Sequence, residues 1–223
     1  MRAERLSTPA AERPQLEARW PAALAIIIAI VLYATLPDPL ELGPRWVFPA
    51  VEGAILLPLM VTRPHRRAGE SGRSRMAAIT LIGLANVANV ASLGQLIHLL
   101  ISGTHFTGRT LFFSAIEIYL TNVIIFGLWF WELDGGGPSA RLGRTSPYRD
   151  FLFPQMNAPK LTPPDWRPSF LDYLYVSLTN ATAFSPTDTL PLTRMAKLLM
   201  GIQCIASLLT VALVAGRAVN ILG

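Results

Sequence analysis

The sequence predicts an all-α, polytopic transmembrane bundle of about six membrane segments, the fifth of them short. The composition is the first reason: 52% of the 223 residues are hydrophobic and 15% are charged. With a mean hydropathy of +0.42, the chain is too apolar for an ordinary soluble domain. The second reason is that the apolar residues gather into five or six blocks, and a helix needs roughly 20 residues to cross about 30 Å of hydrocarbon. We therefore expect one integral membrane domain over residues 1–223.

The first part of the chain predicts a polar arm and four transmembrane helices. Residues 1–19 carry mixed charges, and residues 20–133 contain four apolar blocks. The first block ends at Thr35-Leu36-Pro37, which is a poor signal-peptidase site, so we expect it to stay in the membrane as a helix. The predicted blocks are residues 20–36, 46–62, 76–101 and 110–133.

The last part of the chain is more polar and leaves a choice of topology open. Residues 134–168 are rich in Gly, Pro, Arg and Asp, a composition that predicts an extramembrane loop. Residues 169–185 have a helical pattern, but 17 residues reach only about 26 Å. This segment is therefore either a fifth crossing or a re-entrant half-helix. Residues 191–222 predict a long final helix.

The distribution of basic residues predicts which way round the protein sits. Along the chain, successive hydrophilic stretches carry four, one, five, one and five Lys or Arg. Basic loops stay in the cytoplasm, so the N-terminal arm and residues 134–168 are expected there, in a multi-pass protein of the cell inner membrane. Six crossings would place the C-terminus inside, whereas a re-entrant segment would place it outside.

Charge, cysteine content and motifs argue against several classes of function. The net charge is +5 and the pI is about 9.9, but the basic residues lie in the stretches between the apolar blocks. Membrane topology therefore explains the charge better than nucleic-acid binding does. The single cysteine, Cys204, excludes an intramolecular disulfide and a multi-cysteine metal site. No nucleophile elbow, zinc-protease motif, phosphate loop or dinucleotide fingerprint is present. We expect neither an enzyme nor a cofactor.

Polar side chains inside the apolar blocks predict a network within the membrane. Such residues are costly in hydrocarbon unless they are paired or hydrated, so they face the bundle interior or a polar path. They also join helices by hydrogen bonds, and an ion pair or hydrogen-bonded network and a proton or ion relay are equally open. Arg217 is a candidate countercharge for one of the glutamates. The candidate network is Glu52, Asn86, Asn89, Glu117, Asn122, Asp172 and Arg217.

Residues 175–193 (YVSLTNATAFSPTDTLPLT) are the most unusual stretch. Hydroxyl and amide side chains crowd a short helix, Pro186 ends it, and Asp188 follows. This order resembles the pore helix, filter and inner helix of tetrameric pore-loop cation channels. Residues 179–188 contain no glycine, so a potassium filter of stacked backbone carbonyls is not expected. The candidate ion path is Thr179, Asn180, Thr182, Ser185 and Asp188.

The whole chain also resembles a group of uncharacterised bacterial inner-membrane proteins. The phrases that carry this likeness are FPAVEGAILLPL, LTNVIIFGLWFWELDGGGPSAR and DYLYVSLTNATAFSPTDTLPLTRMAKLLM. The resemblance implies a polytopic helical fold and an inner-membrane location, and it brings no activity with it.

Two functions are weighed from the sequence. The first is an ion channel-like or ion-transporting protein, in which side-chain oxygens along residues 179–188 replace part of the hydration shell of a monovalent cation and Asp188 concentrates cations. We expect a homo-oligomer, because one six-helix chain has little room for a central pore. The alternative is a non-conducting interaction or scaffold protein, with membrane lipids and a docked protein as its partners.

Overall fold

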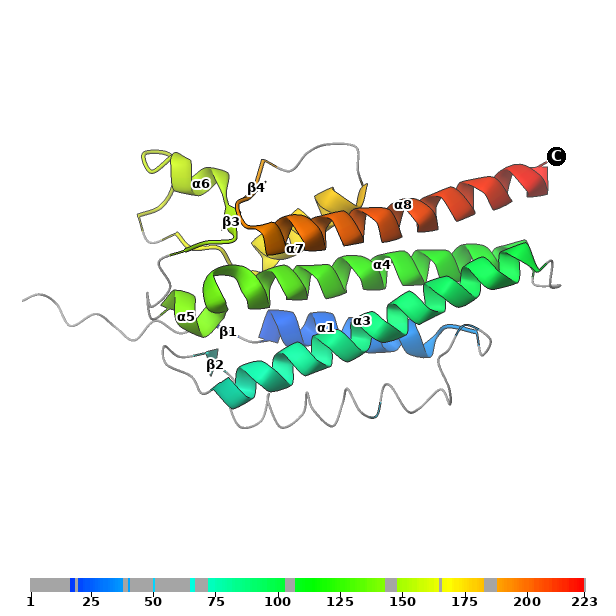
Figure 1. The fold of residues 1–223 in the computed structure, drawn as a ribbon, viewed down its shortest axis with the longest axis horizontal. Helices are drawn as coiled ribbons and strands as arrows, with labels where there is room; N and C mark the ends of the chain where they lie inside the picture. Colours follow the sequence, from blue (N-terminus) through cyan, green and yellow to red (C-terminus); the bar gives the residue numbers. More distant parts are fainter. Residues whose placement is uncertain are drawn as a thin grey trace, which may run out of the picture.

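The computed structural model is a bundle of long helices, with most of the shorter elements gathered at one end (Figure 1). It describes residues 17–18, 20–37, 40, 50, 65–66, 72–102, 107–142, 148–164, 166–182 and 188–222. The second predicted membrane segment, residues 46–62, lies outside the described residues apart from Ala50.

Three helices are long and apolar enough to cross a membrane, which gives the chain the architecture of a membrane protein. They are α3 (Gly72–Ile101), α4 (Gly108–Leu133) and α8 (Arg194–Leu222). Helix α1 (Trp20–Ala34) has 15 residues and a length of about 22 Å, so it falls short of a full span by itself. The described residues thus confirm the helical membrane fold, and they do not confirm six membrane segments.

Helix α4 is the central helix of the bundle. It packs against α1, α3, α8 and the short helix α7 (Phe170–Thr182). In the most apolar 18-residue stretch of each helix, 61% of α4 is buried, whereas only 17% of α8 is buried. An exposed apolar side as long as that of α8 fits a hydrocarbon surrounding. Its exposed large side chains include Leu198, Ile202, Ile205 and Leu208.

The bundle has a capped end, which we define as the end where α4 finishes at Leu133. There the chain forms η2 (Asp134–Gly136), α5 (Pro138–Leu142), β3 (Phe151–Leu152) and α6 (Pro154–Asn157). The predicted loop of residues 134–168 therefore contains short elements and, among its described residues, no long helix. Strands β1 (Glu17–Ala18) and β2 (His65–Arg66) pair antiparallel, and Figure 1 shows them at this end as well.

Helix α7 runs back along α4 from the capped end. The Tyr173 hydroxyl lies 2.6 Å from an Asp134 carboxylate oxygen, and the Ser177 hydroxyl donates to the Val123 carbonyl at 2.6 Å. Since α7 has 13 residues, it extends about 20 Å along the bundle. It therefore ends well short of the far end of α4.

The chain then returns to the capped end before α8 begins. Strand β4 (Leu190–Pro191) pairs antiparallel with β3, and the Leu192 amide donates to the Asp150 carbonyl at 2.8 Å. Helix α8 starts two residues later and runs the length of the bundle (Figure 1). Both ends of residues 170–193 thus lie at the capped end.

Candidate functional site

A polar seam joins α4, α7 and α8 within the bundle. We define it as Asn122, Ser177, Asn180, Gln203 and Ser207. The Gln203 amide donates to the Ser177 hydroxyl at 2.6 Å and to the Ser177 carbonyl at 2.9 Å. The Asn180 amide donates to the Gln203 side-chain oxygen at 2.8 Å. The Asn122 amide donates to the Ser207 hydroxyl at 2.9 Å. The seam fixes α7 against its two neighbours.

Of the predicted ion-path residues, Thr179, Asn180 and Thr182 lie at the end of α7 that points away from the cap. The Thr179 hydroxyl donates to the Tyr175 carbonyl and the Thr182 hydroxyl to the Thr179 carbonyl, each at 2.9 Å. A hydroxyl that donates its proton in this way keeps its lone pairs for another partner. Asn180 belongs to the seam. Asp188 is exposed just before β4, and Ser185 lies outside the described residues.

Among the predicted network residues, the asparagines differ in environment. Asn89 and Asn122 are buried, whereas Asn86 is half-buried. Only Asn122 takes part in the seam that joins α4 to α8. The structure therefore brings Asn122 together with residues of the final helix, a link that the sequence did not predict.

The two described acidic residues of the predicted network, Glu117 and Asp172, lie on different helices. Glu117 is half-buried in the middle of α4. Asp172 accepts from the Ser169 amide at 2.7 Å and from the Ser169 hydroxyl at 2.8 Å. This is the contact of a capping box, so Asp172 stabilises the N-terminal end of α7. Glu52 and the side chain of Arg217 lie outside the described residues.

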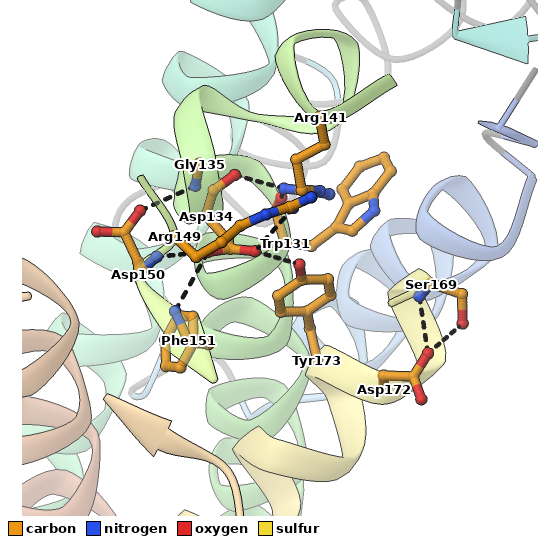
Figure 2. A network of polar contacts seen from close by, with 10 residues as sticks. All are labelled: Trp131, Asp134, Gly135, Arg141, Arg149, Asp150, Phe151, Ser169, Asp172 and Tyr173. Atoms are coloured by element: carbon orange, nitrogen blue, oxygen red, sulfur yellow. Dashed lines mark hydrogen bonds and ion pairs between the residues drawn. The ribbon is translucent and has the colours of Figure 1, made fainter. Parts of the chain in front are cut away.

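The centre of the capped end is Asp134, which is fully buried (Figure 2). One carboxylate oxygen accepts from the Asp150 amide at 2.7 Å and from the Phe151 amide at 3.2 Å. The other accepts from the Tyr173 hydroxyl, and Arg149 Nη1 lies 3.6 Å from it. One side chain therefore ties the end of α4 to β3 and to the first turn of α7.

Arg141 closes the C-terminal end of α4. Its Nη1 donates to the Trp131 carbonyl at 2.8 Å and to the Asp134 carbonyl at 2.6 Å. The last carbonyls of a helix lack helical partners and carry partial negative charge, so a guanidinium is well placed there. Its Cζ also lies 5.1 Å from the centre of the Tyr173 ring. Burial raises the pKa of the Tyr173 phenol well above its ordinary value, so the hydroxyl stays protonated and donates.

Asp150 connects the cap to the start of α8. It accepts from the Gly135 amide at 2.9 Å and from the Thr193 hydroxyl. The Thr193 oxygen in turn accepts from the Ala196 amide at 3.3 Å, as a helix N-cap does. We call Asp134, Arg141, Arg149, Asp150, Tyr173 and Thr193 the capped-end network.

Neither the capped-end network nor the α8 part of the seam was predicted from the sequence. A signal for the seam was present, because Gln203, Ser207 and Thr210 follow one another at helical spacing in an apolar helix and all three are buried. A weaker signal for the network was an acidic residue, Asp134, directly after an apolar helix and before three glycines.

The fold and the seam define a class, a helical membrane protein whose short α7 is held against longer helices. No protein-family model, curated protein or solved structure matches the chain. The resemblances stated from the sequence therefore stay predictions. Among the described residues, no three His, Cys, Asp or Glu side chains come together as metal ligands.

Proposed function

We propose that this chain is an ion-transporting membrane protein of the pore-loop type, with a path for monovalent cations past the end of α7. The observation that carries the proposal is the course of residues 170–193. They leave the capped end as α7, are back at that end at β4, and continue into α8. A re-entrant helix followed by a long spanning helix supports this kind of protein more than a simple fifth crossing would.

The C-terminal end of α7 matters because its last carbonyl groups need partners within the membrane. A helix that stops within hydrocarbon leaves its last carbonyl groups without helical partners. Such groups are tolerated at membrane depth only where protein or a water-filled cavity covers them. In transporters, half-helix ends of this kind coordinate cations. A helix of about 20 Å cannot cross about 30 Å of hydrocarbon, so α7 meets this condition in our topology.

The charges near the path favour cations. The C-terminal end of a helix carries about half a negative charge. The last turn of α7 contains no basic residue that would cancel it. The oxygens of Thr179 and Thr182 lie on the same turn, and the exposed carboxylate of Asp188 follows. The helix end and the threonine oxygens would lower the energy of a partly dehydrated cation, and Asp188, which lies beside β4 at the capped end, would concentrate cations at the mouth of the path.

Several copies of the chain are needed to enclose such a path. One side of α7 is uncovered in a single bundle, where Leu171, Tyr175 and Leu178 are exposed. We therefore propose a homo-oligomer in which α7 and its return segment face the symmetry axis. From the basic loops, we place the capped end in the cytoplasm and the protein in the inner membrane of a bacterium.

The test is cation flux into liposomes that contain the purified protein, measured for K⁺, Na⁺ and H⁺ with gradients and with an applied voltage. We expect flux above protein-free liposomes, a decrease of several-fold in Asp188→Asn, and retention in Asp188→Glu, because a charge at the mouth sets local cation concentration. Asp188 is exposed, so both variants should keep the melting temperature of the wild type.

Absence of flux under every gradient and voltage would overturn the proposal. It would favour the alternative, a non-conducting interaction or scaffold protein. The polar seam fits that alternative as well, since hydrogen bonds such as that between Asn180 and Gln203 also join membrane helices that conduct nothing.

A further inference from the structure

Three arginines surround the glycine turn that ends α4. The turn consists of Gly135, Gly136 and Gly137, all with positive φ (56°, 83° and 95°). A Cβ on Gly135 would lie 3.4 Å from Arg141 Cγ and 3.4 Å from Arg149 Cδ. A Cβ on Gly137 would lie 3.3 Å from Arg75 Nε. Glycine therefore lets side chains from α3, α5 and the segment before β3 close on one turn. We call Arg75, Arg141 and Arg149 the arginine cluster.

Each arginine of the cluster has a buried nitrogen without a hydrogen-bond acceptor in the described part of the chain. These atoms are Arg75 Nε, Arg141 Nη2 and Arg149 Nη1. The Arg141 residue is only 7% exposed. A buried charged donor is costly to leave unpaired, so three arginines around one turn that each carry such an atom indicate an acceptor that the described residues do not supply.

The neighbouring carboxylates are already occupied. Asp134 accepts from two amides and from Tyr173, and Asp150 accepts from Gly135 and Thr193. Glu132 is fully buried and has an interaction of its own. Arg149 Nη1 is 3.6 Å from Asp134, which is an ion-pair distance but is long for a hydrogen bond.

From this arrangement we infer that the arginine cluster binds a phosphate group at the capped end. A phosphate offers several acceptor oxygens in the geometry that guanidinium groups match. The group could belong to the headgroup of an anionic lipid, since basic pockets between transmembrane helices bind such headgroups. It could equally be free phosphate, and the experiment separates these two sources. The inference does not depend on the proposed cation path.

The test uses the full-length protein in neutral detergent and follows its melting temperature. Dioleoyl phosphatidic acid is titrated against dioleoyl phosphatidylcholine, which has the same acyl chains. Inorganic phosphate is titrated against chloride at equal ionic strength. A ligand that binds only the folded protein raises the melting temperature saturably, which yields an apparent Kd.

Variants locate the site. In Arg149→Gln we expect the apparent Kd to rise about tenfold or more, because charge-assisted bonds are lost. Arg75→Gln, on α3, is a second variant that tests the same prediction if Arg149→Gln does not fold. Arg194→Gln removes the same charge from an exposed position at the start of α8, and we expect it to change the Kd by less than about twofold.

The two probes distinguish a lipid headgroup from free phosphate as the source of the bound group. Saturable stabilisation by phosphatidic acid alone assigns the site to a lipid headgroup, and stabilisation by inorganic phosphate as well assigns it to the phosphate group itself. Either result supports the inference. No saturable shift with either probe would overturn it. Equal losses in Arg194→Gln and in the two cluster variants would also overturn it, because binding would then depend on overall charge.

Discussion

At the residue scale, Asp134 does more than any other described side chain to hold the capped end. Its carboxylate joins the end of α4, strand β3 and helix α7, although its partners are as far as 39 positions away in the sequence. A buried carboxylate is costly unless it is fully hydrogen-bonded, and here both oxygens have partners. The cap should therefore depend on this one residue.

We predict that Asp134→Ala lowers the free energy of unfolding by roughly 3–5 kcal/mol, because it leaves Tyr173 and two amides without their acceptor and removes the ion-pair partner of Arg149. Tyr173→Phe removes one bond and should cost about 1–2 kcal/mol. The exposed Asp188→Ala is the matched control and should stay within about 0.5 kcal/mol. Denaturant unfolding in detergent measures all three. Equal stability of Asp134→Ala and Asp188→Ala would contradict the role of Asp134.

The glycine turn gives a second residue-scale prediction. Gly137 has φ +95°, and a Cβ there would lie 2.9 Å from the Glu132 carbonyl oxygen. We predict that Gly137→Ala costs about 1–3 kcal/mol of unfolding free energy. Gly201→Ala on α8 is the control, because a Cβ there meets nothing within 4 Å. It should be neutral or stabilise by up to about 1 kcal/mol. Similar melting temperatures of the two variants would argue against a strained turn.

At the element scale, the attachment of α7 to α8 depends on Gln203. Its side chain donates to Ser177 twice and accepts from Asn180. Hydrogen bonds between membrane helices contribute about 0.6 kcal/mol each, so Gln203→Leu should destabilise the protein by roughly 2 kcal/mol. The neighbouring Ile202 is exposed, and Ile202→Leu should have almost no effect. Heat unfolding followed by circular dichroism compares the two. The seam would lose its proposed importance if both variants melted together.

The long helices were predictable because their apolar blocks determine them locally. The predicted blocks 76–101 and 110–133 correspond to α3 and α4, and the predicted helix 191–222 corresponds to α8. Pro186 and the polar content of residues 169–185 also indicated a short helix, and α7 ends at Thr182. For these elements, the hydropathy pattern contains most of the information needed.

The capped end and the seam were not predictable in the same way. Asp134 meets Asp150, Phe151 and Tyr173 only after the loop has folded back, and no local pattern encodes that meeting. Likewise, Asn122 was predicted to be a polar network residue, but its partner Ser207 lies 85 positions away. The sequence indicates which polar side chains need partners, whereas their pairing depends on the tertiary fold.

At the scale of the whole molecule, the capped end organises the topology. Helices α1 and α3 begin near it, α4 finishes at it, α7 leaves from it, and α8 starts from it and runs to the other end (Figure 1). The first turn of α7 and strand β4 therefore both lie at the capped end. Helix α8 then ends at the side of the bundle opposite the cap. The proposed cation path depends on this arrangement.

The most direct test of this arrangement is the sidedness of two positions that flank α7. Single cysteines are introduced in a Cys204→Ala background as Leu161→Cys, Asp188→Cys and Ser102→Cys, all at exposed positions. A membrane-impermeant maleimide is then applied to intact cells and to inverted membrane vesicles. We predict that positions 161 and 188 are labelled from the same side and position 102 from the other. Labelling of 188 together with 102, opposite to 161, would show that α7 crosses the membrane and would contradict the re-entrant segment.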